Sequence, residues 1–344
     1  MKILEFGSDF HRCDENFHGV NDFLQKVSNI RYYANGRMAI EALIKQECWN
    51  RIWVPVYFCY EVIEHIKTTG ICVELYDDYP LNENVDFTIR TLPYKAGDVL
   101  LRMHYFGLYS YSNYNDLPVP VIEDFTHSLI AQYAVNSAAD WCIASIRKSL
   151  PVAAGGILWS PQNKRLPTQL HSSGNCEVMS KIRYSAMSIK AEYLKYGGNK
   201  EIFRSKYLQS EKLIECLELS GIDKVSYDIF HSLDVNKWTN YRKNNWEYAV
   251  NLLDTRFNIL CMSGSSGYPF SIIIICESAD ERTALKQYLI ANNVFPAILW
   301  TIPNNSSFFN AFSLSNRMLS IHCDPRYSKD DIKQMCRIIN SYYD

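Results

Sequence analysis

The sequence lacks the cysteine pattern of a disulfide-stapled or zinc-binding protein. It has 11 cysteines in 344 residues, an odd number, and no C-x-x-C pair. In a chain of this length, scattered cysteines are typical of buried, reduced thiols. We therefore expect neither a disulfide framework nor a metal site.

Long apolar runs and an excess of one charge are also missing. Residues 1–19 contain no stretch typical of a secretory signal peptide. The most apolar run, residues 272–276, has the length of a strand and not the roughly 20 residues that span a bilayer. The formal net charge of -2 argues against nucleic acid or an anionic membrane as the main partner. We expect a soluble, cytoplasmic protein that acts on small molecules.

The two common glycine-rich nucleotide motifs, G-x-G-x-x-G and G-x-x-x-x-G-K-[ST], do not occur. A phosphate site of another kind is indicated at Gly36 and Arg37, where a glycine turn opens an apolar helical pattern. Backbone N–H groups and the dipole at a helix start favour phosphate. An ordinary N-terminal cap is the alternative interpretation of the same residues.

The remaining patterns alternate between strand and helix. Strands are expected at residues 52–55, 71–75, 99–103, 119–122, 141–146 and 157–159, with a helix at 61–69. Helices follow at 176–196, 200–220 and 235–253, and then a smaller α/β unit with strands 270–276 and 318–322 and helices 280–292 and 329–342. Ser328 is the expected cap of the last helix. The sequence predicts an α/β fold with a mostly parallel sheet flanked by helices, plus a smaller C-terminal α/β domain.

One expected strand ends in polar side chains. Residues 121–127, VIEDFTH, bring Asp124 and His127 to a strand end, where an aspartate can hold a cationic ring nitrogen. A capped strand end would look the same.

Residues 145–156, SIRKSLPVAAGG, place Lys148 in an apolar turn closed by glycines. A desolvated amine loses its proton more easily and can form a Schiff base with a carbonyl, although most lysines lie at the surface. A phosphate turn, an aspartate and a lysine in this order are what pyridoxal phosphate requires.

The chain resembles the DegT/DnrJ/EryC1/StrS aminotransferases, pyridoxal-phosphate enzymes of fold type I that mostly transaminate keto sugars. The resemblance is carried by YYANGRMAIEALI, MHYFGL, VIEDFTHSL and SIRKSLPVAAGG, and it extends over most of the chain. It implies a large cofactor-binding domain over residues 1–240 and a small domain over residues 241–344.

The resemblance also implies a role for each site residue. Lys148 would hold the cofactor and move the proton, Asp124 would pair with the pyridine nitrogen, and His127 would lie near that aspartate or the ring hydroxyl. The other cofactor-binding residues that it implies are Gly36, Arg37, Phe58, Cys59, His104 and Ser145. Trp300 and Arg317 are candidates for the substrate side.

The implied activity is transfer of an amino group from glutamate or glutamine to a nucleotide-linked keto sugar, in polysaccharide or amino-sugar biosynthesis. The implied assembly is a homodimer with a shared active site, and residues 227–248, rich in Trp, Tyr, Arg and Asn, suit such an interface. A tyrosine-rich lining would suit hydroxylated rings, and the tyrosines concerned are Tyr57, Tyr60, Tyr105 and Tyr109.

Two alternatives remain. One is a non-catalytic sensor or scaffold that binds the same cofactor. The other is a related enzyme with a different reaction, such as a sugar dehydratase. Those dehydratases carry histidine in place of the lysine, so Lys148 counts against the second alternative.

Overall fold

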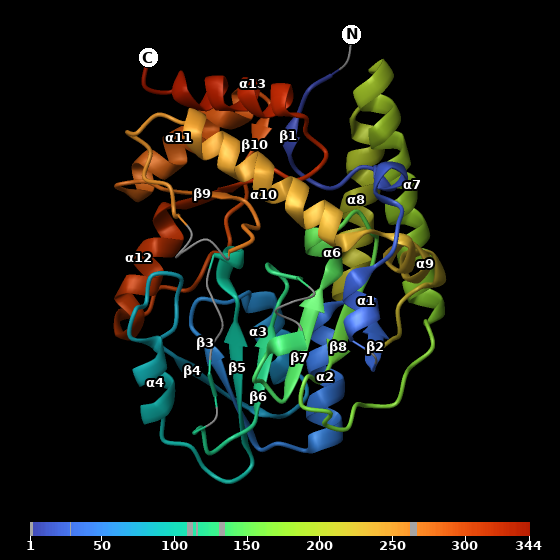
Figure 1. Ribbon diagram of the computed structural model, residues 1–344, viewed down its shortest axis with the longest axis vertical. Helices are drawn as coiled ribbons and strands as arrows, with labels where there is room; N and C mark the ends of the chain where they lie inside the picture. Colours follow the sequence, from blue (N-terminus) through green and yellow to red (C-terminus); the bar gives the residue numbers. More distant parts are fainter. Residues whose placement is uncertain (1–2, 28, 109–112, 115, 131–134, 262–266) are drawn as a thin grey trace. The chain divides into compact units, whose positions relative to one another are not determined.

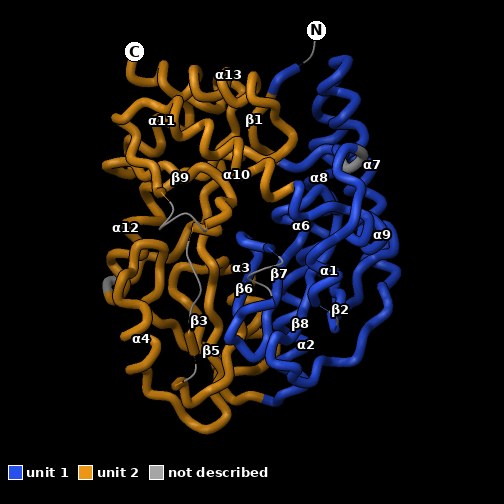
Figure 2. The backbone as a smooth tube through the Cα atoms, viewed as in Figure 1, with its two compact units in different colours: residues 1–4, 9–48, 123–237 blue, residues 5–8, 49–122, 238–344 orange. Residues whose placement is uncertain are grey.

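The structure is a computed structural model, and it describes residues 3–27, 29–108, 113–114, 116–130, 135–261 and 267–344. Tyr109 lies outside the described residues. The chain divides into two compact units (Figure 2). The first unit comprises residues 1–4, 9–48 and 123–237, and the second comprises residues 5–8, 49–122 and 238–344. The division into domains at residues 240 and 241 stays a prediction.

Seven strands form one mostly parallel sheet, in the order β2-β8-β7-β6-β5-β3-β4 (Figure 1). Strand β3 pairs in parallel with β4 and with β5, whereas β8 is antiparallel to both β2 and β7. The α/β fold that the sequence predicts is therefore confirmed. The strands are β2 (Ile30–Tyr33), β3 (Arg51–Pro55), β4 (Cys72–Tyr76), β5 (Asp98–Met103), β6 (Val121–Asp124), β7 (Trp141–Ser145) and β8 (Gly156–Trp159).

Helix α2 is the helix of the first unit that packs against β2, β7 and β8. It begins where the side chain of Asn35 accepts a hydrogen bond from the N–H of Met38, and its inner face is fully buried. Helices α7 and α8 pack against each other around Met187 and Phe203. The helices of this unit are α1 (Asp22–Lys26), α2 (Gly36–Glu47), α6 (Ile146–Ser149), α7 (Gly174–Tyr196), α8 (Glu201–Glu215) and α9 (Lys224–Ser232), with the 3-10 helix η1 (Asp14–Phe17).

The second unit contains two further two-stranded sheets. Strand β9 (Ile272–Ile275) is antiparallel to β11 (Met318–Ile321), and β1 (Phe6–Gly7) is parallel to β10 (Val294–Phe295). Its helices are α3 (Tyr60–Lys67), α4 (Val85–Thr91), α11 (Ala279–Ala291), α12 (Phe309–Arg317) and α13 (Lys329–Asn340), with the 3-10 helices η2 (Tyr105–Gly107) and η3 (Ser306–Phe308). The expected cap of the last helix is confirmed, because Ser328 and Asp331 form a capping box at the start of α13.

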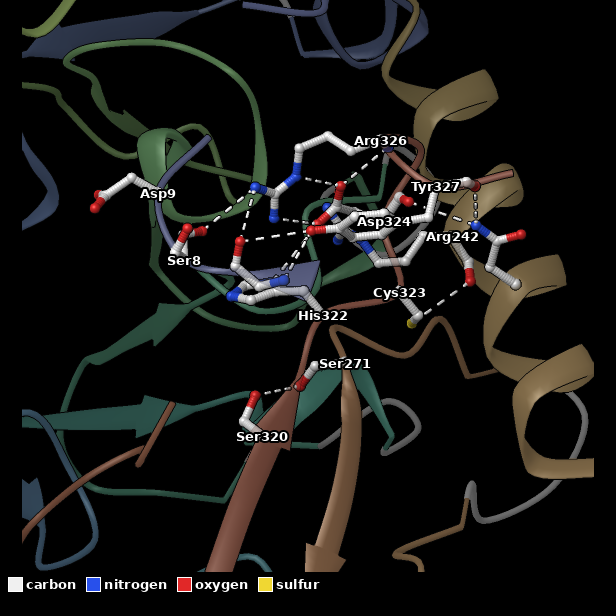
Figure 3. A network of polar contacts seen from close by, with 12 residues as sticks. Ser8, Asp9, Arg242, Ser271, Ser320, His322, Cys323, Asp324, Arg326 and Tyr327 are labelled. Carbon is white, nitrogen blue, oxygen red and sulfur yellow. Dashed lines mark hydrogen bonds and ion pairs between the residues drawn. The ribbon is translucent and has the colours of Figure 1, made fainter. Parts of the chain in front are cut away.

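A buried ionic network follows β11 in the second unit (Figure 3). The Nε and Nη2 atoms of Arg326 each donate to the Asp324 carboxylate at 2.8 Å, and Nδ1 of His322 lies 3.6 Å from it. Tyr327 accepts a hydrogen bond from the N–H of Gly7 at 2.8 Å. The network therefore ties the short strand β1 to the segment that precedes α13.

The cysteines were expected to be buried thiols, and several of them are exposed. All eleven are free thiols, but Cys48, Cys72, Cys216 and Cys261 are exposed. Cys48 and Cys216 directly follow helices, and Cys72 begins strand β4. At such positions a reduced thiol can stay in contact with water, so the absence of a disulfide pattern in the sequence did not imply that the cysteines are buried.

The stretch 227–248 has one buried helix face and several exposed residues, among them Tyr227 and Tyr241, each 37% exposed. Helix α10 (Val235–Leu252) places Trp238, Arg242, Asn245 and Trp246 at 5% exposure or less. These residues recur every three to four positions, so they share one helix face that packs inward. The expectation that this stretch provides an interface rests on its exposed residues alone and stays a prediction. Among the described residues, no helix combines the length and the apolar character needed to cross a membrane.

Candidate functional site

In the first unit, two strand ends and a single helical turn meet at Thr126. The N–H of Thr126 donates to Oδ1 of Asp124 at 2.8 Å, and its Oγ1 accepts from the N–H of Ser145 at 2.9 Å. The hydroxyl of Ser149 donates to the Thr126 carbonyl at 2.6 Å. Asp124 ends β6 and Ser145 ends β7. One threonine therefore holds the aspartate segment to the lysine segment.

Asp124 and His127 are both buried, at 6% and 3% exposure. They flank the turn that Thr126 organises, and the N–H of Ser128 closes it by donating to the carbonyl of Phe125 at 2.9 Å. A buried carboxylate needs partners that stabilise its charge. The turn supplies one such partner through the backbone N–H of Thr126.

The start of α2 lies against the lysine segment because two glycines leave room for it. A Cβ atom on Gly156 would come within 2.1 Å of the carbonyl oxygen of Asn35. A Cβ atom on Gly36 would lie 3.1 Å from Cβ of Ser145. The N–H of Gly155 also donates to the carbonyl of Ala34 at 2.8 Å. The structure thus brings the predicted phosphate turn and the lysine segment into direct contact.

Two polar side chains at this contact, those of Asn35 and Ser145, do not use all of their hydrogen-bonding capacity for capping the helices. Oδ1 of Asn35 caps α2, but Nδ2 of the same side chain is buried and has no hydrogen-bond partner among the described residues. The side chain of Ser145 does not cap α6, the turn that follows it. Such groups, together with the free N–H groups of a helix start, can bind an anion.

Lys148 itself is exposed in the chain, which corrects the expectation of a desolvated amine. The segment around it is buried as expected, from Leu150 to Gly156. Within the single turn of α6, however, Ile146 and Ser149 occupy the inner side and leave Lys148 on the outer side. A helical turn of four residues cannot bury every side chain, and the sequence does not state which one faces out.

Phe58, Cys59 and His104 belong to the second unit, where Phe58 is part of an aromatic cluster. The ring of Trp300 lies 5.9 Å from that of Phe58 and 6.2 Å from that of Tyr57, which in turn lies 5.8 Å from the ring of Tyr105. The Tyr57 hydroxyl is buried and has no hydrogen-bond partner among the described residues, and burial raises the pKa of Tyr57. Cys59, partly buried, precedes α3 and does not cap it.

His104 and Arg317 also belong to the second unit. His104 is 8% exposed and follows strand β5. Arg317 ends α12, and its Nε donates to the carbonyl of Ser313 at 3.2 Å. This local bond gives Arg317 a structural role as the last residue of its helix.

No protein-family model and no curated protein match the sequence. Solved structures do match it. A protein assigned as a sugar aminotransferase from Streptococcus pneumoniae has a TM-score of 0.63 at 11% identity, with 99% of this chain and 97% of that chain covered. An aminotransferase from Streptoalloteichus hindustanus has a TM-score of 0.63 at 13% identity, with coverages of 99% and 98%.

A third similar structure is a DegT/DnrJ/EryC1/StrS aminotransferase from Brucella abortus. Its TM-score is 0.57 at 14% identity, with 96% of this chain and 92% of that chain covered. The Streptococcus protein has also been solved in a PLP form and in a PMP form. The chain therefore has the fold of these aminotransferases, as the resemblance of its sequence implied.

Proposed function

We propose that this protein is a pyridoxal-phosphate-dependent aminotransferase. The observation that carries the proposal is the contact of three segments in the first unit: the start of α2 with Gly36, the aspartate turn with Asp124, and the segment of Lys148. The fold supports it, because similar folds belong to aminotransferases solved in PLP and PMP forms.

The residues of this site fit the cofactor. The start of α2 offers the N–H groups of its first turn and the buried, unpartnered amide nitrogen of Asn35 to a phosphate, and Gly36 lets Ser145 approach that turn closely. Buried Asp124 offers a negative charge to a protonated ring nitrogen. Lys148 offers an accessible amine.

Bound pyridoxal phosphate would supply an electrophilic carbon and a ring that accepts the electron pair released when a substrate carbon loses its proton. Nζ of Lys148 would hold the cofactor and, once an amino donor has displaced it, would move that proton as a general base and acid. The carboxylate of Asp124 would favour a protonated ring nitrogen. His127, buried beside Asp124 in the same turn, orients the aspartate or the ring.

A nucleotide-linked keto sugar is the proposed acceptor, and glutamate or glutamine is the proposed amino donor. The support is that similar structures include proteins described as sugar aminotransferases. The setting that we propose is amino-sugar biosynthesis in the cytoplasm, by a homodimer. Turnover on a panel of nucleotide-linked keto sugars, compared with simple 2-keto acids, tests the acceptor; faster turnover of the 2-keto acids would contradict it.

The central test is chemical labelling of Lys148. After incubation with pyridoxal phosphate and reduction with borohydride, peptide mass spectrometry should find the pyridoxyl group on Lys148. Lys148→Ala should lose both the label and transamination. Lys181→Ala, which removes an exposed lysine from α7, should keep both. A label at another lysine would overturn the site.

Asp124→Asn separates cofactor binding from chemistry in the same experiment. The amide keeps the size and the hydrogen bond from Thr126 but removes the charge that stabilises a protonated ring nitrogen. This variant should still be labelled at Lys148 and should lose most of its turnover. A wild-type protein that is labelled but inactive on every acceptor and donor would instead indicate a cofactor-binding sensor or scaffold.

A further inference from the structure

Two arginine side chains that the proposed chemistry does not use converge beside the start of α2. Arg37 is the second residue of α2, and Arg147 directly precedes Lys148. Nη2 of Arg37 donates to the carbonyl of Ile214, and Nη1 of Arg147 donates to Oε1 of Glu211 at 3.2 Å. Glu211 and Ile214 are three residues apart in α8, so they lie on the same side of that helix. Both guanidinium groups are therefore held by its last turn.

A third arginine extends the group. Arg183 of α7 donates from Nη1 to Glu211 and from Nη2 to Asp9 at 2.8 Å. Burial alone would raise the pKa of Glu211, but the charges of the surrounding cations lower it to about 2. The members of this cationic cluster are Arg37, Arg147, Lys148 and Arg183. With the partly exposed carboxylates of Asp9 and Glu211, the four cations named here make a group of formal net charge +2.

The position of the excess charge is unfavourable for the chain alone. The first turn of a helix carries the positive end of the helix dipole, where acidic side chains stabilise and basic ones destabilise. The first turn of α2 has no acidic residue and contains Arg37. Burial is the largest cause that lowers the pKa of Arg147; the charges of Arg183 and Arg37 act in the same direction, while those of Glu211 and Asp9 oppose them. An anion at the helix start would relieve both effects.

Both arginines also have a buried N–H donor that makes no hydrogen bond among the described residues. The Nε atoms of Arg37 and of Arg147 are buried and have no hydrogen-bond partner among the described residues. The side chain of Arg147 is only 10% exposed. A buried donor of a charged group that is left unpaired costs more than a neutral one. The buried donors without a partner among the described residues therefore include Nδ2 of Asn35, which caps α2, Nε of Arg37 in α2 and Nε of Arg147 in α6.

We propose that Arg37 and Arg147 provide the countercharge for a phosphate dianion bound at the start of α2. The inference rests on the proposed function, in which that phosphate belongs to the cofactor. A phosphate group carries a charge of about -1.5 to -2 at neutral pH, which matches the excess charge of the cationic cluster. A phosphorylated substrate would present the same group, and the experiment below separates the two sources.

The first measurement compares the Kd of pyridoxal phosphate with that of pyridoxal, which lacks the phosphate. Arg37→Met and Arg147→Met should each weaken pyridoxal phosphate about tenfold or more, the size of one charge-assisted hydrogen bond, and should leave pyridoxal unchanged. Arg204→Met removes an exposed arginine from α8 and should change neither value. An unchanged ratio of the two Kd values in both test variants would overturn the proposal.

The second measurement follows the protonation of the bound phosphate by 31P NMR. Beside two arginines, the phosphate should stay dianionic from pH 8 to well below its ordinary second pKa of about 6. In the double variant Arg37→Met/Arg147→Met, its resonance should titrate near that ordinary value. A merely structural role would not move this titration. Arg147→Lys keeps a charge and is more certain to fold, and it should recover part of the shift.

A third measurement identifies the source of the phosphate. Inorganic phosphate should compete with pyridoxal phosphate for the apoprotein and should not bind the protein once Lys148 carries the cofactor. Arginine-dependent binding of inorganic phosphate to the cofactor-loaded protein would place a substrate phosphate there and overturn the assignment to the cofactor. Absence of any pyridoxyl label on Lys148 would instead defeat the proposed function, and unchanged inorganic-phosphate binding in both arginine variants would defeat this inference.

Discussion

At the scale of single residues, arginine side chains stabilise the charge of a carboxylate in each unit. Asp324 is fully buried, and burial alone would raise its pKa; the charge and hydrogen bonds of Arg326 outweigh that effect and hold the pKa below its usual range. Glu211 in the first unit follows the same pattern. Asp78 is the opposite case, because burial raises its pKa to about 6 despite the charge of Arg102. Each shift is also a statement about stability at a given pH.

Asp324→Asn tests this link. Because its pKa is lower in the folded chain than the unfolded value of about 3.9, Asp324 stabilises the fold above about pH 4, and this stabilisation is lost as the pH falls towards the folded pKa. The variant should lose about 3 kcal/mol in urea unfolding at pH 7, since Arg326 is left buried without its partner charge. The loss should shrink by pH 3.

Asp228→Asn is the control for this experiment, because Asp228 forms an exposed pair with Lys224. It should cost a few tenths of a kcal/mol at either pH. An equal loss for Asp324→Asn at pH 7 and pH 3 would mean that packing, and not charge, is the reason for its effect.

The sequence alone predicted which residue types gather at the site better than how each side chain lies. Asp124 and His127 were expected at a strand end, and both lie at the end of β6 and just after it. Thr126 was missed as the residue that connects the segments, although its position between them was the available signal. The exposure of Lys148 could not be predicted, because it depends on which side of one helical turn packs inward.

At the scale of elements, the two glycines at 36 and 156 decide how closely the lysine segment meets α2. Gly156→Ala should therefore lower the free energy of unfolding by about 2 kcal/mol or more, because the new Cβ would lie 2.1 Å from the carbonyl oxygen of Asn35. Strand β8, which holds residue 156, and strand β2, which precedes Asn35, cannot separate without breaking their pairing. The substitution should also weaken pyridoxal phosphate, since the start of α2 is displaced. Urea unfolding and cofactor titration measure the two effects.

Gly174→Ala is the matched control. Gly174 is the first residue of α7, and no atom lies within 4 Å of the position that its Cβ would take. Its stability should be unchanged or slightly higher. A fully stable Gly156→Ala protein with normal cofactor affinity would contradict the idea that this close approach shapes the site.

Elements with a strong pattern were predicted well, and weakly patterned ones were not. The expected strands between residues 52 and 159 match β3 to β8, and the capping signal at Ser328 marks the start of α13. Strand β2 (Ile30–Tyr33) and helix α9 (Lys224–Ser232) were missed. The strand is four residues long and only partly buried at three of them, so its pairing with β8 comes from tertiary contacts that no local pattern reveals.

At the scale of the whole molecule, the exposed position of Lys148 leaves its amine open to water in the single chain. Proton transfer by such an amine is more effective when water is excluded, so a group that provides cover from water would assist it. A second copy is the natural source, because closed two-fold dimers are the commonest oligomers. Exposed apolar side chains are present in the first unit for such a contact, at Val178, Ile202 and Leu208.

We therefore predict that the cofactor-loaded protein is a homodimer whose second chain helps to cover Lys148. Light scattering should give twice the chain mass of 39.9 kDa. Because the cover depends on association, dilution below the dimer dissociation constant should lower turnover per chain and make Lys148 of the apoprotein more reactive towards an amine-acetylating reagent. The reactivity of exposed Lys181 should stay constant and serves as the internal standard. A monomer with full turnover would refute the shared site, and a dimer whose Lys148 reacts equally at every concentration would show that the second chain does not cover it.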